Sequence, residues 1–279
     1  MENQTSPLRQ YQRQPKLFIN LPSNGKWYDE HTVADGSTAD LAVFSMTASD
    51  EIGFKTPDAL INGQATTKTM KSCIPALLNP WNIRTIDTDS ILIAIRMATY
   101  GQNMSVSTIC SKCKEQNAYE VDLQRYLDYY ATKIYNDTVI YNDFRVKLFP
   151  LTYQQWTDIQ KKQTAFQRSL NLQIPRITDE KQKEEAIQSI IDQINELTVV
   201  SIFDQVQSIE VNNEIETDKK EIINFLSNQD VEFFHKIKNT IEQNVKEWSL
   251  PTEDVECGNC KNKEKLKVSL DSSDFFVQG

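Results

Sequence analysis

Apolar and polar residues follow two different rhythms along this chain, and these rhythms predict strands and helices. Residues 17–21 (LFINL) and 41–44 (LAVF) are short apolar runs, which are typical of strands. Cap residues such as Thr47 and Asp87, followed by apolar residues three and four apart, predict helices. One helix is expected to begin at Thr47, and three more are expected at 57–62, 67–78 and 87–100. Pro75 should end or kink the helix at 67–78.

The second half of the chain predicts two β-hairpins and several helices. Strands at 139–141 and 144–148 flank the turn Asn142-Asp143, and a strand at 206–211 precedes Asn212-Asn213. Helices are expected to begin at Asp179, Asp218 and Asp230, because each acid precedes a run with helical apolar spacing. Their expected buried faces are Ile187, Ile190, Ile191, Ile194 and Leu197, then Ile222, Ile223, Phe225 and Leu226, then Phe233, Phe234, Ile237, Ile241 and Val245.

Four of the five cysteines form two closely spaced pairs. These are Cys110-Ser-Lys-Cys113 and Cys257-Gly-Asn-Cys260. Two thiolates three positions apart across a tight turn can bind the same ion, and two such pairs complete the tetrahedral shell of Zn²⁺. A lysine follows each pair at once and helps to offset the negative charge of four thiolates. The sequence therefore predicts one structural Zn²⁺ site at these four residues.

The two pairs stand in matching frames. A valine follows 11 positions after the first cysteine of each pair, and a leucine follows 13 positions after it. Alternation predicts a strand at 119–123 after the first pair and at 266–270 after the second. A knuckle followed by a strand, twice, is the layout of a zinc ribbon. However, 143 residues separate Cys113 from Cys257, whereas an ordinary ribbon has about 15–20 residues between its cysteine pairs. The predicted ribbon is therefore split by a long insertion. This is acceptable because the entropic cost of closing a loop grows only slowly with loop length.

Two other interpretations of the pairs remain open, namely redox-active pairs and unlinked free thiols. Redox pairs of the thioredoxin type open a helix, whereas strands are expected here. Structural disulfides need an oxidising compartment, and the polar start of the chain contains no export signal. The fifth cysteine, Cys73, is expected to be a small buried residue of a helix.

Composition then narrows the function classes. The 279 residues favour about two domains, and 39 acidic against 30 basic residues give a net charge of −9. Such a chain binds nucleic acid or anionic membranes poorly, and no apolar run approaches the ~18 residues of a membrane span. The sequence has no phosphate-binding glycine motif. Only two histidines, His31 and His235, are present, and both are expected at the surface or in packing.

The expected organisation is an α+β protein: a small N-terminal α/β-mixed body with a split four-cysteine zinc ribbon and an inserted, mostly helical lobe. Its expected parts are a flexible arm (1–16), an N-terminal α+β domain (17–105), the first zinc knuckle with strands (106–150), an acidic helical insertion (151–250) and the second knuckle with a tail (251–279). Residues 178–250 carry the whole net charge of −9. This lobe is either a device that steers a basic partner or an ordinary solvated surface.

Several further stretches stand in a recognisable order: residues 21–28 (LPSNGKWY), 45–51 (SMTASDE), 57–63 (PDALING), 72–74 (SCI), 89–96 (DSILIAIR), 99–101 (TYG), both cysteine knuckles and Phe275-Phe276. Together they resemble the baseplate hub and hub-assembly proteins of T-even-type contractile-tail bacteriophages, over residues 17–125 and 255–276. The resemblance implies a structural role without enzymatic activity at the tip of a phage tail. It implies other baseplate hub or tail proteins, or a second copy, as partners. Expected locations are the virion baseplate and, during assembly, the host cytoplasm.

Candidate contact elements are the N-terminal arm, which is expected to become ordered against a partner, and residues 274–277 (DFFV). The latter either hook a partner or pack on the protein's own ribbon. The alternative function is a zinc-ribbon nucleic-acid-binding or regulatory factor, which needs a basic face. Lysines do gather near the knuckles, but the overall acidity opposes this function. The lysines that would form this basic face are Lys112, Lys114, Lys261, Lys263, Lys265 and Lys267.

A zinc enzyme is disfavoured because catalytic zinc keeps an open position, whereas four cysteines fill the shell.

Overall fold

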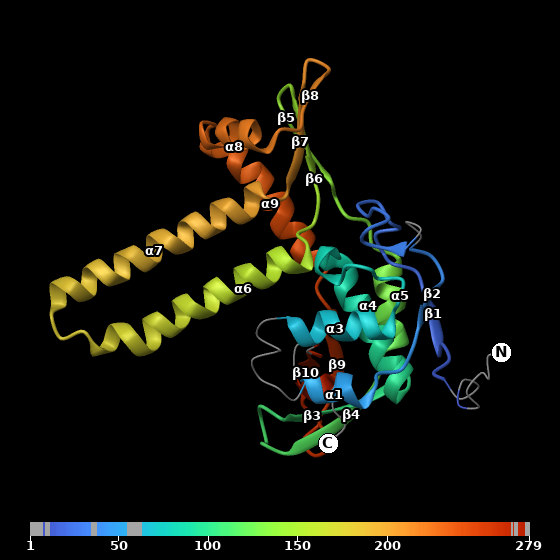
Figure 1. The fold of residues 1–279 in the computed structure, drawn as a ribbon. Coiled ribbons are helices and arrows are strands. Elements are labelled where there is room, and N and C mark those ends of the chain that lie inside the picture. Colours follow the sequence, from blue (N-terminus) through green and yellow to red (C-terminus); the bar gives the residue numbers. More distant parts are fainter. Residues whose placement is uncertain are drawn as a thin grey trace, which may run out of the picture. The chain divides into compact units, whose positions relative to one another are not determined.

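The structure is a computed structural model that describes residues 8, 12–34, 38–54, 63–268, 270 and 273–276. The chain divides into two compact units, each described by itself below (Figure 1). Unit 1 contains Met1–Ile83, Asp87–Lys133 and Leu250–Gly279, and unit 2 contains Arg84–Ile86 and Ile134–Ser249. The helix expected at 57–62 and most of the expected arm lie outside the described residues. No helix in the described ranges has the length and apolar character needed to cross a membrane.

Unit 1 is built around one helix that is buried on all sides. This helix, α4 (Thr85–Tyr100), has an unbroken run of buried residues from Ile91 to Ile95. A helix that is apolar all round belongs inside a protein, and α4 is therefore central to the core of unit 1. Around α4 stand β1 (Leu17–Ile19), paired antiparallel with β2 (Leu41–Val43), and the helices α1 (Ala48–Phe54), α3 (Gln64–Cys73) and α5 (Gln124–Ala131).

Helix boundaries in unit 1 follow local chemistry. Thr47 and Asp50 cap α1 reciprocally: the Asp50 N–H donates to the Thr47 hydroxyl at 3.2 Å, and the Thr47 N–H donates to the Asp50 carboxylate at 2.8 Å. The helix expected at 67–78 is shorter at its end, because α3 stops at Cys73. The residue before a proline avoids the helical conformation, and Ile74, which precedes Pro75, has φ −130° and ψ 84°.

A buried carboxylate ties the turn after β1 to α4. Asp87 is fully buried and accepts hydrogen bonds from the Ser23 N–H at 2.8 Å and the Tyr28 hydroxyl at 2.6 Å. Burial raises the pKa of Asp87 to about 6, although the two hydrogen bonds lower it. The turn that links Ser23 to Tyr28 is therefore anchored to the central helix.

Both chain ends that the structure describes are attached to unit 1. The Arg13 guanidinium donates to the Ser45 carbonyl at 2.6 Å and to the Ser72 carbonyl at 3.1 Å, so the expected arm is attached from Arg13 onward. At the other end, α10 (Ser273–Phe276) buries Phe275 and Phe276. Phe276 stacks on Phe54 of α1, with ring centroids 4.4 Å apart. These two rings are part of the core rather than an exposed hook.

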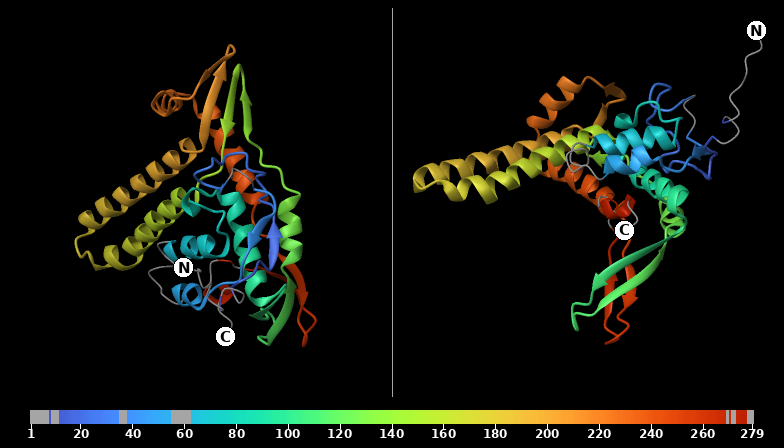
Figure 2. Two further views of the ribbon diagram at one scale, coloured as in Figure 1. Left: turned by 45° about the vertical axis from the view of Figure 1, so that its right-hand side comes forward. Right: turned by 60° about the horizontal axis from the view of Figure 1, so that its bottom comes forward.

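Two β-hairpins of unit 1 lie side by side (Figure 2). One pairs β3 (Asn103–Ile109) with β4 (Gln116–Asp122), and the other pairs β9 (Glu253–Glu256) with β10 (Lys263–Leu266). The strand expected at 266–270 was misplaced, because β10 ends at Leu266. Each cysteine knuckle reverses the chain at once, so the return strand begins six positions after the first cysteine and pairs with an incoming strand that the alternation did not reveal.

Unit 2 contains one antiparallel sheet of four strands in the order β5-β6-β7-β8. The hairpins β5 (Thr138–Tyr141)–β6 (Phe144–Leu148) and β7 (Val206–Val211)–β8 (Glu214–Glu216) were both expected, and pairing of β6 with β7 joins them. Asn142, Asn212 and Asn213 have positive φ, as such turns require. The helices α8 (Lys219–Ser227) and α9 (Val231–Glu247) share one core with the sheet. That core includes Val139, Val146, Leu148, Ile202, Phe203, Val206, Ile209, Ile222, Leu226, Phe233, Ile237 and Ile241.

The buried face of α9 differs from the expected one at its end. Asp230 caps the helix as expected, accepting from the Phe233 N–H at 2.8 Å. Val245, however, is 67% exposed, and its neighbour Asn244 is only 2% exposed. The Asn244 amide donates to the Asn136 carbonyl at 2.9 Å and accepts from the Asn136 N–H at 3.1 Å. Asn244 is therefore buried instead of Val245, because its side chain supplies the hydrogen-bond partners that the backbone of Asn136 would otherwise lack.

The remaining part of unit 2 is a helical hairpin of α6 (Tyr153–Arg168) and α7 (Glu180–Phe203), joined by a π-helical turn (Ser169–Gln173) and a 3₁₀ turn (Ile174–Arg176). Asp179 caps α7 as expected. Only part of the expected apolar face is buried. Ile190 and Leu197 are each 9% exposed, but Ile191 and Ile194 are 43% and 37% exposed.

Candidate metal centre

The four paired cysteines meet at the tips of the two hairpins of unit 1. Their sulfur atoms all lie within 4.8 Å of one another. Two of the separations between the knuckles are 3.7 Å, from Cys110 Sγ to Cys260 Sγ, and 3.6 Å, from Cys113 Sγ to Cys257 Sγ. Tetrahedral Zn²⁺ with Zn–S bonds of 2.3 Å requires sulfurs about 3.8 Å apart. The arrangement therefore fits a single ion, and these residues are able to bind a metal.

The two knuckles have the same backbone turn. Lys114 N–H donates to the Cys110 carbonyl, and Lys261 N–H donates to the Cys257 carbonyl, both at 3.0 Å. The two lysines also share a left-handed backbone, with φ of 63° and 58°. The ladder next to each knuckle is likewise equivalent, because Ile109 pairs with Gln116 and Glu256 pairs with Lys263. The hairpins thus repeat one structure with a constant offset of 147 positions in the sequence.

One side chain from the opposite hairpin braces each knuckle. Asn117 of β4 accepts from the Gly258 N–H at 2.9 Å and donates to the Cys257 sulfur at 3.5 Å. Glu264 of β10 accepts from the Ser111 N–H at 2.8 Å and also from the Ser111 hydroxyl. Such partners orient the ligands of a metal site, and losing one typically weakens metal binding by about 10- to 100-fold. Sequence reasoning missed both, although each stands seven positions after the first cysteine of its pair.

Hydrogen bonds favour the thiolate form of Cys257, whereas burial and hydrogen bonds to the three other cysteines raise the pKa of Cys260 to about 12. Backbone N–H groups of Cys260 and Asn259, together with the Asn117 amide, lower the pKa of Cys257 to about 6, against the opposing effect of burial. Cys110 and Cys257 are each 1% exposed, whereas Cys113 and Cys260 are half-buried. The first cysteine of each knuckle is therefore shielded from solvent, and the second lies nearer the surface.

Lysines near the knuckles are interleaved with acids. Lys265 pairs with Asp254 at 3.2 Å, and Lys261 pairs with Glu256 at 3.6 Å. Arg125 similarly pairs with Glu253 at 3.1 Å. Because these charges are exposed and mixed in sign, the ribbon does not present the uniformly basic face that nucleic-acid binding needs.

The other residues singled out in the sequence stand apart from the cluster. Cys73 is fully buried in α3, as expected, and burial raises the pKa of its thiol to about 12. His31 and His235 are both exposed. Neither histidine belongs to the only group of metal-binding side chains found within the described residues.

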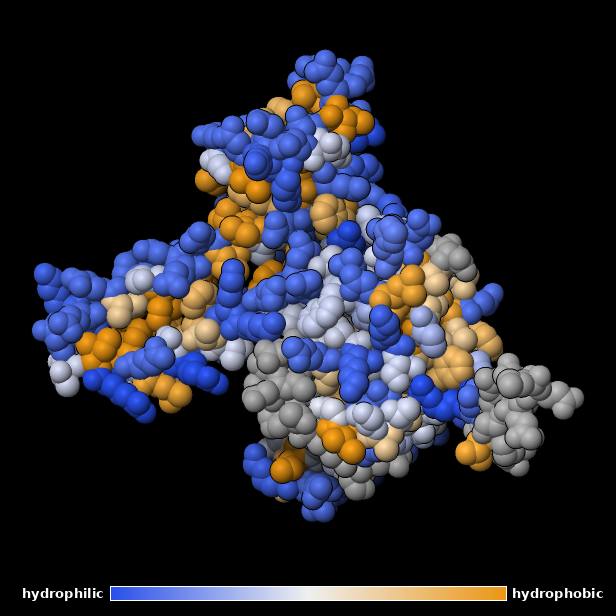
Figure 3. Space-filling view, viewed as in Figure 1, coloured by the Kyte–Doolittle hydropathy of each residue, from blue (hydrophilic) through white to orange (hydrophobic). Residues whose placement is uncertain are grey.

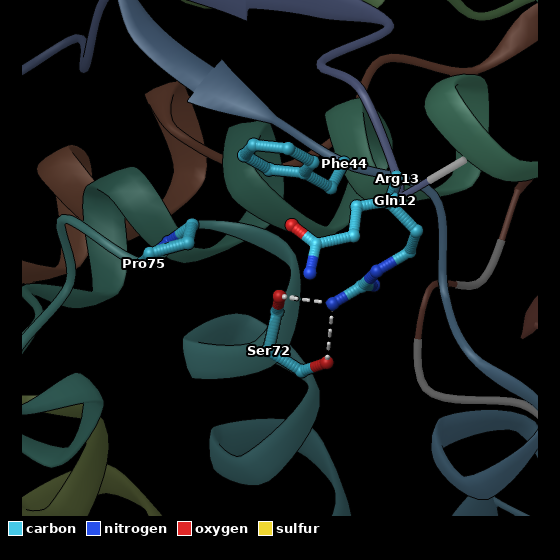
Figure 4. A pocket seen from close by; sticks show the side chains of 5 residues that line it. All are labelled: Gln12, Arg13, Phe44, Ser72 and Pro75. Atoms are coloured by element: carbon cyan, nitrogen blue, oxygen red, sulfur yellow. Dashed lines mark hydrogen bonds between the residues drawn. The ribbon is translucent and has the colours of Figure 1, made fainter. Parts of the chain in front are cut away.

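A separate small hollow in unit 1 is lined by Gln12, Arg13, Phe44, Ser72 and Pro75 (Figure 4). The Arg13 guanidinium points toward Ser72, to which it is hydrogen-bonded, and also lies 5.9 Å from the centre of the Phe44 ring. Its donors are therefore engaged with carbonyl oxygens of the same chain. The contacts in this hollow therefore attach the N-terminal segment at Arg13 to the rest of unit 1.

The fold and the cysteine cluster define a mixed α and β protein whose four-cysteine ribbon is split by a long insertion. The chain matches the model of the T4 bacteriophage base plate protein family over residues 14–277, and it belongs to that family. This confirms the resemblance to T-even-type baseplate proteins seen in the sequence. No curated protein and no solved structure matches the chain. Family membership identifies a phage baseplate protein whose partners are other tail proteins.

Proposed function

We propose that this protein is a non-enzymatic structural or assembly component of the baseplate hub of a contractile-tail bacteriophage. It acts through contacts with other hub or tail proteins, in the virion baseplate and, during assembly, in the host cytoplasm. The observation that carries this proposal is the family match, which spans residues 14–277. The restriction to the hub rests on the ordered stretches described above, from residues 21–28 to Phe275-Phe276.

Within this function we assign Cys110, Cys113, Cys257 and Cys260 as ligands of one structural Zn²⁺. Sulfur separations of 3.6 and 3.7 Å between the knuckles support the assignment. Four thiolates complete the shell, so the ion would have no open position for a reacting water. Bound there, the metal would supply folding free energy and join two hairpins that are far apart in the sequence.

The proposal is tested by quantitative mass spectrometry of purified phage particles and of stalled tail-assembly intermediates. A fixed copy number in finished particles identifies a built-in hub component, and presence only in hub intermediates identifies an assembly factor. Both outcomes support the proposal. Absence from both preparations, or presence only in baseplate parts outside the hub, overturns it. Zinc analysis of the purified protein should give one ion per chain, and a metal-free, fully folded protein would contradict the assigned ligands.

A further inference from the structure

The helical hairpin of unit 2 exposes aliphatic side chains that its own packing does not use. Along α7, Ile191 and Ile194 are 43% and 37% exposed, and Val199 and Val200 are 37% and 46% exposed. In the connecting turn, Leu172 is 54% exposed. Figure 3 shows apolar side chains gathered along this hairpin between hydrophilic ones. Ile191 and Ile194 are three positions apart and so share one face of α7, and neighbouring exposed aliphatic residues of this kind are typical of a surface that binds another protein.

The two helices of the hairpin carry opposite charge. Between residues 153 and 168, α6 has three basic residues and one acid, for a net charge of +2; between residues 180 and 203, α7 has five acids and two lysines, for a net charge of −3. Some of these charges are paired within their own helix, such as Lys181 with Glu185. Within the described part of the chain, the exposed Lys162, Arg168, Glu184 and Glu196 form no ion pair.

We propose that this hairpin is a self-association surface, on which a second copy of the same chain docks with α6 of one copy against α7 of the other. A two-fold contact of this kind brings each basic helix beside an acidic one twice. It also covers the aliphatic residues of both copies. A uniformly basic partner would suit α7 but would meet Lys162 and Arg168 on α6, so the presence of both signs favours a second copy. The proposal does not depend on the hub assignment.

The test uses the full chain in sedimentation velocity over a range of concentrations. The variant Lys162→Glu/Arg168→Glu makes both helices acidic, whereas Glu184→Lys/Glu196→Lys makes both helices basic. Each variant alone should self-associate at least about tenfold more weakly, because every reversal counts twice in a two-fold contact. Mixed together, the two variants are complementary again and should form a 1:1 heterodimer.

Two further variants complete the design. Ile191→Ser/Ile194→Ser should weaken association while leaving the free energy of unfolding nearly unchanged, since both side chains are exposed. The control Lys220→Glu/Lys236→Glu reverses two exposed charges on α8 and α9 and should associate like the wild type. Circular dichroism checks the fold of each variant. A wild-type protein that stays monomeric, association that the hairpin variants do not weaken, or a mixture that fails to associate would each overturn the proposal.

Discussion

Asn117 and Glu264 occupy equivalent positions in the two cysteine hairpins, and each accepts a hydrogen bond from the residue after the first cysteine of the opposite knuckle. The braces cross, so neither knuckle is held by its own hairpin alone. One brace is a neutral amide and the other a carboxylate, which means that the backbone plan is symmetric although the side-chain chemistry is not. The two hairpins are therefore expected to depend on each other for their shape.

Removing a brace should weaken metal binding without removing a ligand. Asn117→Ala leaves the Gly258 N–H without its acceptor, and Glu264→Ala does the same to Ser111. We expect metal affinity to fall by about 10- to 100-fold in each case, measured by competition with a chelator. Glu264→Gln keeps the acceptor oxygen and should lie closer to the wild type. Gln116→Ala is the matched control, and an equal loss there would show that the braces are not special.

Replacing a ligand should have a larger effect. Cys113→Ser or Cys260→Ser should abolish stoichiometric zinc and lower the free energy of unfolding by more than about 4 kcal/mol, because metal binding and folding are coupled. Cys73→Ala removes a buried thiol outside the cluster and should retain zinc. Metal analysis and urea unfolding measure both quantities. A ligand variant that keeps one zinc per chain at wild-type stability would refute the site.

Stability should depend on pH through Asp87. Its folded pKa of about 6 lies above the value of an unfolded aspartate, near 3.9. Between these two values the folded state binds the proton more tightly, so this group makes the protein less stable as pH rises from about 4 to 6, by about 3 kcal/mol in total, with no further change above that.

Urea unfolding of Asp87→Asn across this range isolates the effect. The variant cannot ionise, so its stability relative to the wild type should rise between pH 4 and pH 7. Asp40→Asn, an exposed change, should follow the wild type throughout. A constant difference between Asp87→Asn and the wild type over the whole range would show that the carboxyl does not titrate as described.

Asn244 and Val245 give a direct comparison between pattern and structure. Asn244→Ala leaves the Asn136 N–H and carbonyl without partners, which should cost about 2–4 kcal/mol. Val245→Ala alters a side chain that is 67% exposed and should change stability by less than about 0.5 kcal/mol. Thermal or urea unfolding of both variants tests the order, and the reverse order would restore the face expected from helical spacing.

Phe276 should contribute to folding rather than to partner capture. It is 2% exposed and stacks on Phe54, so Phe276→Ala should destabilise the purified protein by about 3 kcal/mol or more. The free energy of unfolding of the isolated chain is the measurement. If stability were unchanged while binding to tail proteins was lost, the exposed-hook interpretation would be correct instead.

Local signals in the sequence predicted much of this structure. Thr47, Asp179, Asp218 and Asp230 all cap helices as expected, and the asparagine turns form the expected hairpins. These features depend on residues within a few positions of one another. The cysteine pairs were visible for the same reason, and their matching frames suggested the meeting that the structure shows.

The features that were missed depend on distant residues. Whether Asn244 or Val245 is buried depends on the backbone at Asn136, 108 positions away. Pairing of β6 with β7 and exposure of Ile191 likewise depend on which segments meet in space, which spacing along one helix cannot reveal. The positions of Asn117 and Glu264 could have been found by extending the 147-residue offset to every position of the two hairpins.

The separation of the two knuckles in the sequence also delays formation of the four-cysteine cluster during synthesis. With 143 residues between Cys113 and Cys257, a ribosome adding 5–20 residues per second needs about 7 to 30 s to make the intervening segment. Cys110 and Cys113 therefore lack the other two cysteines of the cluster while unit 2 is synthesised, and unit 2 has time to fold in that interval. The four-cysteine cluster can close only on chains that extend past Cys260, so chains that end within the insertion cannot form it.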